Sequence, residues 1–283
     1  MDIETTTTSD GVKLHGVCFF PDKPRTDLLI DGLIMVHGSS GNFYSSASTD
    51  RARHFCELGI PVAVFNTRGH DTIAGASQSG GHKIGNAFER LSEAHLDIKA
   101  QLDWAEARGF KRIGLLGSSL GAVKVVLSQA KLQDPRVACV ISVGPLRFSQ
   151  RYYAACEMSA MHMGYKAQAE ALVKAGKGDA IMSVDFPNDG AHFSASVYLD
   201  RHCSEHYDIC AGHTDQIRCP VLVVTGSEEK HPRMRDVGRD MNALAAKKNP
   251  GYRWSHTQGG GHGLHEHNDV FFSEIMGFLG ATW

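Results

Sequence analysis

Residues 112–124 read RIGLLGSSLGAVK and contain the tightest turn that the sequence predicts. The aliphatic run 112–116 is typical of a buried strand, and apolar residues recur at helical spacing after the turn. A strand that turns sharply into a helix strains the backbone of the central residue, so small residues must flank it. Gly117 and Gly121 supply that room around Ser119. The stretch therefore predicts a strand, turn and helix that leave a serine hydroxyl exposed at the edge of a sheet.

The same alternation of a short aliphatic run, a glycine turn and a helical stretch recurs on both sides of this unit. It is typical of parallel strands joined by crossover helices, and it predicts an α/β fold with a mostly parallel central sheet flanked by helices. Further strands are predicted at residues 12–20, 32–36, 61–66, 137–143, 219–225 and 252–257. Helices are predicted at residues 46–58, 88–105, 120–130 and 267–279.

About 75 residues separate the strands predicted at 137–143 and 219–225. A regular strand-helix-strand unit needs only about 30 or more residues, so this interval holds an insertion. We expect a core formed by residues 1–145 and 216–283, with residues 146–215 inserted as a cap. Alanine, methionine and tyrosine between Tyr152 and Lys174 predict helices in the first half of the cap. Its methionines and tyrosines could line an acyl or aromatic pocket, or pack the cap helices together.

Two loops could supply catalytic partners for Ser119. A serine hydroxyl needs a base within hydrogen-bond reach, and the base needs a carboxylate that fixes its tautomer. His262 lies in the sequence GGGHG after the last predicted strand, where glycines leave room to present an imidazole. Glu228 and Glu229 follow Gly226 at the end of the strand 219–225, and either could serve as the acid.

The order of Ser119, an acid and His262 along nearly the whole chain resembles the α/β-hydrolase superfamily, with its G-x-S-x-G turn and nucleophile, acid and histidine order. In such proteins the acid commonly stands three residues after the glycine that closes the strand. The resemblance therefore selects Glu229 over Glu228. Glutamate departs from the commoner aspartate, and its longer side chain reaches the histidine by a different geometry. The resemblance implies a serine esterase or lipase type of enzyme with a helical cap.

Residues 37–41, HGSSG, resemble the oxyanion loop of the same superfamily, in which the residue after HG donates its backbone N–H. Ser39 is that residue, and the N–H of Leu120 after the nucleophile is the second expected donor. The alternative for residues 37–41 is a simple glycine and serine turn. Arg68, Gly69 and His70 resemble a further segment of the superfamily that is more often structural than catalytic.

These residues favour hydrolysis of a small or medium carboxylic ester through an acyl-enzyme on Ser119. A thioesterase, an amidase or a carbon-carbon bond hydrolase would use the same triad, because fold and triad do not specify the bond. A non-catalytic ligand-binding relative with a vestigial triad is a third possibility. The sequence names neither the acyl and leaving groups nor the oligomeric state.

Composition limits the partners. Arginine and lysine number 29 against 31 acidic residues, and this formal charge of -2 does not favour nucleic acid or an anionic membrane. The apolar runs are far shorter than the roughly 20 residues of a membrane span. No basic and apolar leader appears at residues 1–11, and seven scattered cysteines do not resemble a disulfide framework. We therefore expect a small-molecule substrate and a cytoplasmic location.

The sequence does not predict a cofactor or a metal. No phosphate-binding glycine motif of the nucleotide-binding types is present. Cys203, His206, Cys210 and His213 have the side chains of a zinc site, but three residues between the two pairs are far fewer than the dozen or so of a zinc finger. We expect these thiols and imidazoles to be buried or solvated in a cap loop.

Overall fold

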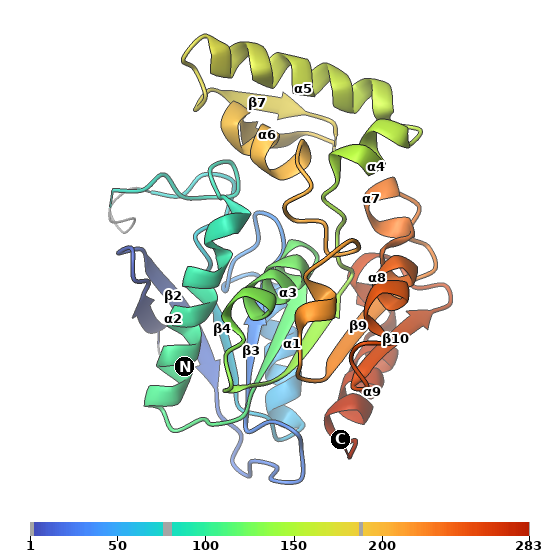
Figure 1. Cartoon of the computed structure of the whole chain (residues 1–283). Coiled ribbons are helices and arrows are strands. Elements are labelled where there is room, and N and C mark those ends of the chain that lie inside the picture. The colour runs from blue at the N-terminus through green and yellow to red at the C-terminus, as the bar shows by residue number, and fades with distance from the viewer. Residues whose placement is uncertain (1–2, 76–80, 187–188, 283) are drawn as a thin grey trace.

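A computed structural model of the chain describes residues 3–75, 81–186 and 189–282. In that part, eight strands form one sheet in the order β1-β2-β4-β3-β5-β6-β9-β10 (Figure 1). The strands β1 and β4 run antiparallel to β2, which lies between them. The six strands β4, β3, β5, β6, β9 and β10 are parallel to one another. The strands are β1 Ile3–Thr7, β2 Lys13–Phe19, β3 Gly32–Val36, β4 Val62–Phe65, β5 Ile113–Ser118, β6 Val137–Val143, β9 Val221–Gly226 and β10 Tyr252–Thr257.

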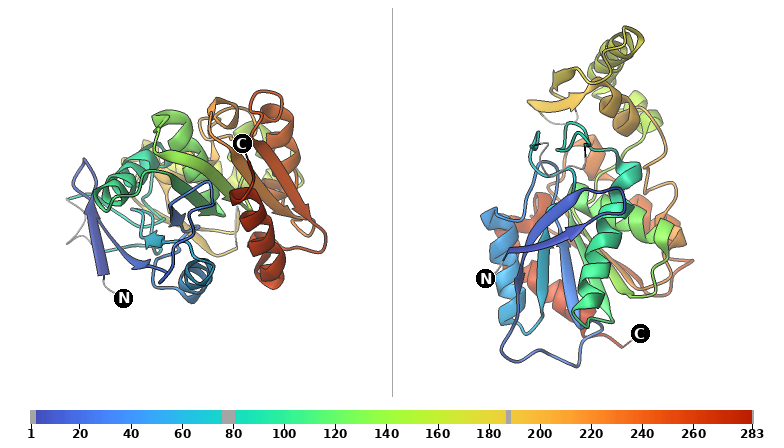
Figure 2. Two further views of the ribbon diagram at one scale, coloured as in Figure 1. Left: turned by 90° about the horizontal axis from the view of Figure 1, so that it is seen from below. Right: turned by 90° about the vertical axis from the view of Figure 1, so that its left-hand side faces the viewer.

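Helices cover both faces of the sheet, which is why the central strands are buried along almost their whole length. Phe55 and Phe271 pack on one face, and Ile98, Val126 and Met241 pack on the other. Figure 2 shows the two layers of helices on opposite sides of the strands. The first layer contains α1 Ser46–Glu57 and α9 Asn268–Leu279, and the second contains α2 Ala94–Ala107, α3 Leu120–Leu132 and α8 Val237–Ala245.

The mostly parallel sheet between helices confirms the predicted fold class. The helix α8 Val237–Ala245 was not predicted, and two further differences concern β1 and the start of α2. The edge strand β1, Ile3–Thr7, was not predicted because its threonine-rich sequence has no hydrophobic alternation. The helix predicted from Phe88 begins only at Ala94, after a short turn at Leu91–Glu93. Residues 85–90 form a turn and irregular backbone instead of helix, and within them the Glu89 side chain is buried beside Lys124 and Arg201.

Residues 146–215 lie between β6 and β9. Their helices and hairpin, within residues 150–202, lie above the carboxyl ends of the strands (Figure 1), whereas Tyr207, Ile209 and Cys210 pack in the main core. The helices expected between Tyr152 and Lys174 are present as α4 Gln150–Ala155 and α5 Ser159–Lys174. The hairpin of β7 Ile181–Val184 and β8 Ala191–Ser194, followed by α6 Ala195–His202, was not predicted. The insertion has a small apolar core of its own, formed by Ala169, Met182, Val184, Phe193, Ala195, Val197 and Tyr198.

A search of the helices within residues 3–75, 81–186 and 189–282 finds none with both the length and the apolar character that crossing a bilayer requires.

Candidate active site

The turn between β5 and α3 places Ser119 at the carboxyl end of the central strand. Its backbone is left-handed, with φ 57° and ψ -119°. A β-carbon on Gly117 would lie 2.1 Å from the carbonyl oxygen of Gly121, and one on Gly121 would lie 2.2 Å from that of Val36. The Ser119 N–H donates to the carbonyl of Val143 at 2.9 Å. The turn therefore needs glycine at both positions, and the adjacent strands hold the strained serine in place.

The structure brings Ser119, His262 and Glu229 together, although 143 residues separate the serine from the histidine. His262 Nε2 lies 2.9 Å from Ser119 Oγ, and His262 Nδ1 lies 2.9 Å from Glu229 Oε1. The carboxylate can only accept, so Nδ1 carries the proton and Nε2 is left to accept from the serine hydroxyl. This tautomer is assigned from the hydrogen bonds, and it is the one that a general base requires.

Glu229 and Glu228 occupy different environments. The Glu229 side chain is only 4% exposed and faces His262. The Glu228 side chain is 51% exposed and forms a surface ion pair with Lys230. The structure thus places Glu229 beside the histidine, as the spacing in the superfamily implies, and Glu228 away from it.

The loop that carries His262 is held by close packing and by one arginine. A β-carbon on Gly226 would lie 2.0 Å from the carbonyl oxygen of Gly260, so the end of β9 can pass directly under this loop. Gly263 follows His262 in a left-handed conformation, with φ 74°. Arg51 of α1 donates from Nη2 to the Gly263 carbonyl at 2.7 Å. Arg51 therefore fixes the backbone directly after the histidine.

The loop of residues 37–41 approaches Ser119 closely enough to supply an oxyanion donor. A β-carbon on Gly38 would lie 3.0 Å from the Ser119 β-carbon. Within the described residues, the backbone N–H groups of Ser39 and Leu120 donate to no protein acceptor. Both belong to segments beside the Ser119 hydroxyl, and the Leu120 N–H opens the first turn of α3. The positive end of that helix adds to the attraction for a developing anion.

His37 fixes the direction of the Ser39 N–H. The Thr67 N–H donates to His37 Nε2 at 2.9 Å, so the proton is on Nδ1, which donates to the Gly38 carbonyl at 2.9 Å. The Gly38 C=O and the Ser39 N–H belong to one trans peptide and point in opposite directions. Burial, together with the nearby charge of Lys124, lowers the pKa of His37 to about 3, so this histidine is neutral.

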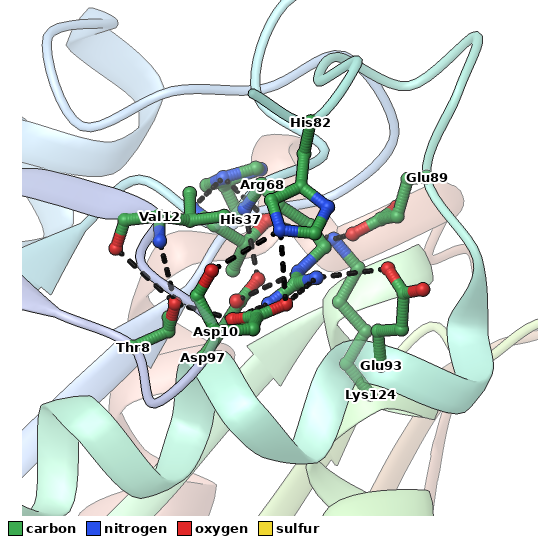
Figure 3. Close-up of polar contacts among 11 residues, drawn as sticks. Thr8, Asp10, Val12, His37, Arg68, His82, Glu89, Glu93, Asp97 and Lys124 are labelled. Carbon is green, nitrogen blue, oxygen red and sulfur yellow. Dashed lines mark hydrogen bonds and ion pairs between the residues drawn. The ribbon is translucent and has the colours of Figure 1, made fainter. Parts of the chain in front are cut away.

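Beneath this loop, Lys124 is buried in an ion pair that the sequence analysis missed. Lys124 Nζ lies 2.6 Å from Glu89 Oε1 and donates to Thr67 Oγ1 at 2.9 Å (Figure 3). Arg201, from α6 of the insertion, lies 3.3 Å from Glu89 Oε2. Burial acts to raise the pKa of Glu89, but the two cations outweigh it and hold that pKa below its usual value. One carboxylate thus connects the helix that carries Ser119 with the insertion.

Arg68 is buried in a second cluster beside the first, as Figure 3 shows, and of its three carboxylates only Asp97 is buried as well. Its guanidinium donates to Asp97 at 2.9 Å, to Glu93 at 2.8 Å and to Asp10 at 2.9 Å. The Asp97 carboxylate also accepts from the Arg68 backbone N–H. Arg68 therefore joins the loop after β4 to the start of α2, and its place is structural.

A cavity of about 400 Å³ opens above Ser119. His262 and the loop of residues 37–41 border it, together with Leu146 at the start of the insertion. The methionines in its wall are Met35 and Met234. Those suggested for the cap do not line it, and Met161 and Met163 are each 43% exposed. The apolar wall therefore comes chiefly from the core.

Comparisons with known proteins agree with the architecture. No family model matches the chain, and no curated protein matches its sequence. An esterase of Pyrococcus furiosus superposes over 98% of this chain and 89% of its own, with a TM-score of 0.65 and 17% identity. An α/β hydrolase of Penicillium sp. sh18 superposes over 98% and 97%, with a TM-score of 0.72 and 18% identity. A proline iminopeptidase of Mycobacterium smegmatis superposes over 98% of this chain and 97% of its own, with a TM-score of 0.60 and 16% identity.

The sheet order, the strained serine turn and these superpositions define one class of architecture. The chain has the α/β-hydrolase fold, as the sequence predicts. Identities of 16 to 18% establish the fold alone, so the chemistry must be argued from the residues of the site.

Replacing Lys124 with methionine tests the buried ion pair. The substitution leaves Glu89 buried with Arg201, 3.3 Å away, as its remaining partner. We expect Lys124→Met to lower the free energy of unfolding by roughly 3 kcal/mol. Lys99→Met is the matched control, because Lys99 pairs with Asp103 on the surface and should cost less than about 1 kcal/mol. Urea unfolding followed by circular dichroism measures both. A loss of unfolding free energy in Lys124→Met that is as small as the loss in Lys99→Met would show that the buried pair does not stabilise the fold.

Proposed function

We propose that the protein is a serine hydrolase that cleaves a small or medium carboxylic ester through an acyl-enzyme. The observation that carries this proposal is the continuous chain of hydrogen bonds from Ser119 through His262 to Glu229 beside a cavity. A nucleophile, a base and a carboxylate that orients the base are the three groups that acyl transfer from a serine requires.

In the proposed reaction the Ser119 Oγ attacks the ester carbonyl while His262 Nε2 takes the hydroxyl proton. Glu229 holds the Nδ1 proton and stabilises the imidazolium that forms. The tetrahedral intermediate collapses, and His262 returns the proton to the leaving alcohol. A water molecule then attacks the acyl-enzyme with His262 again as base, which releases the acid and restores Ser119.

The carbonyl oxygen becomes an anion in both tetrahedral intermediates, and we assign its stabilisation to the Ser39 and Leu120 N–H groups. Three observations support this assignment. Neither N–H group donates to an acceptor among the described residues, and Gly38 lies close to Ser119. The hydrogen bond from His37 Nδ1 to the Gly38 carbonyl orients the peptide that carries the Ser39 N–H. Fixed donors of this type are typically worth about 3 to 4 kcal/mol each in the transition state.

We assign residues 146–215 as a cap over this reaction centre and the remaining residues as the hydrolase core. The position of residues 150–202 above the carboxyl ends of the strands and the contribution of Leu146 to the cavity support this division, and residues 207–210 return to pack in the core. The mechanism requires no cofactor or metal. Seven free cysteines suit the reducing cytoplasm that we propose as the compartment.

The same residues could cleave a thioester, an amide or a carbon-carbon bond. The superposed structures include an esterase and a peptidase by name, so the fold does not select among these bonds. A non-catalytic binding protein is less well supported, because it would not need a serine, a base and an acid in hydrogen-bonding geometry.

Ser119→Ala should lower kcat for a 4-nitrophenyl ester by roughly ten-thousand-fold or more, because it removes the attacking oxygen. A fluorophosphonate should label the wild-type protein at Ser119, and peptide mass spectrometry would identify the labelled residue. Ser118→Ala is the matched control, because it removes the neighbouring hydroxyl and should leave both turnover and labelling in place. Full turnover by Ser119→Ala would rule out the proposed nucleophile.

Glu229→Gln should lower kcat by roughly a hundred- to ten-thousand-fold, because an amide cannot hold the Nδ1 proton of His262 as a carboxylate does. Glu228→Gln is the matched control and should change kcat less than about twofold, since its side chain is at the surface. Steady-state kinetics on the same ester measures both variants. A larger loss in Glu228→Gln would move the role of the acid to that residue.

A further inference from the structure

Arg51 is a buried cation in the wall of the candidate active-site cavity. It lies on α1, and only 6% of the residue is exposed. Among the residues that the structure describes, no carboxylate lies within ion-pairing distance of its guanidinium. The nearby acid Glu266 is instead at the surface, where its carboxylate accepts from the Gly261 N–H. Burying a charge without a counter-charge lowers the stability of the fold, so a buried Arg51 without a carboxylate partner indicates a functional role.

Neutral groups stabilise Arg51 in the absence of a ligand. Its Nη2 donates to the Gly263 carbonyl and to the Asn268 side chain, and its guanidinium carbon lies 3.9 Å from the centre of the Phe271 ring. Burial lowers the pKa of Arg51 to about 10, which still leaves it charged at neutral pH. These contacts hold the cation in place but do not neutralise it.

The Nη1 group of the Arg51 guanidinium remains available to a ligand. Nε and Nη2 donate to Asn268 and Gly263, whereas Nη1 donates to no acceptor within residues 3–75, 81–186 and 189–282. Arg51 borders the same cavity as Ser119. The two N–H groups of Nη1 can still donate to a carboxylate, and little side-chain entropy is lost on binding because Nε and Nη2 already fix the guanidinium.

The surroundings of Arg51 in the cavity favour an anion. Ser45 and Ser48 also line it, and with Arg51 they are spaced by three residues along one face of α1. Arg233 adds a second cation to the wall, and no aspartate or glutamate of the described residues lines it. Burial lowers the pKa of His265, so this neighbouring histidine does not supply the positive charge near neutral pH.

We propose that the substrate is an ester that carries a carboxylate, which Arg51 binds in the cavity while Ser119 attacks the ester carbonyl. This inference rests on the proposed function and narrows it to anionic esters. It makes Arg51 a specificity-determining residue as well as the residue that holds the His262 loop.

Matched pairs of esters test this proposal. The first pair is the 4-nitrophenyl monoester of glutaric acid and its analogue with a terminal carboxamide, which has the same size without the charge. The second pair places the carboxylate or the carboxamide on the leaving group, as in 3-(4-acetoxyphenyl)propanoate and the corresponding propanamide. We expect kcat/KM to favour the carboxylate by roughly tenfold or more in at least one pair.

Arg51→Met should bring this ratio close to 1, and Arg51→Lys should keep part of it, because lysine retains the charge but not the planar group that is fixed by Asn268 and Gly263. Any disturbance of the His262 loop lowers the rates of both esters in a pair and cancels in the ratio. No preference for the carboxylate in either pair, or an unchanged preference in Arg51→Met, would overturn the proposal.

Binding of glutarate to Ser119→Ala, measured by calorimetry against glutaramide, gives a second result that does not depend on turnover. If glutarate binds only when Arg51 is present and no ester is hydrolysed, the anion site stands and the proposed hydrolase function fails. If esters are hydrolysed through Ser119 without a charge preference and glutarate does not bind, the anion site fails and the hydrolase function stands.

Discussion

The left-handed backbone at Ser119 is the constraint on which the rest of the site depends. A non-glycine residue in a strained conformation costs about 1 to 3 kcal/mol, so its surroundings must hold it there. The closeness of Gly117 to Gly121, and of Gly121 to Val36, locks the turn against the neighbouring strand β3. The serine hydroxyl and the Leu120 N–H are thereby fixed relative to each other. The loops that carry His37, Glu229 and His262 leave the ends of strands in the same sheet, so strand pairing fixes their positions relative to this turn.

Buried charge supports the region under this turn. Glu89 joins Lys124 of α3 to Arg201 of α6, and Lys124 in turn reaches Thr67, the residue that fixes the tautomer of His37. A chain of polar contacts thus runs from the insertion to the Gly38–Ser39 peptide, whose N–H we propose as an oxyanion donor. A buried polar network is stable only when each of its charged groups has a partner. Because these partners meet in a single arrangement of the insertion over the core, the network favours that arrangement.

The parts of the fold that could be predicted are those with local signals. The serine turn, the central strands and the order of Ser119 before His262 follow from glycine placement and aliphatic runs. The strand Ile3–Thr7 has no such pattern, because it lies at an edge of the sheet and four of its five residues, Glu4 to Thr7, are polar. The pairing of Glu89 with Lys124 depends on tertiary packing across 35 positions. Its one sequence signal is that Lys124 lies on the apolar face of its helix, where a solvated lysine is not expected.

A crystal structure of the adduct with an organophosphonate would test the central claim most directly. We predict a phosphorus atom bonded to Ser119 Oγ and a phosphoryl oxygen about 2.7 to 3.1 Å from the Ser39 and Leu120 nitrogens. His262 should remain hydrogen-bonded to Glu229 in that adduct. A phosphoryl oxygen directed away from both N–H groups, or the reagent bonded to another residue, would contradict the arrangement of nucleophile and oxyanion donors that we derive.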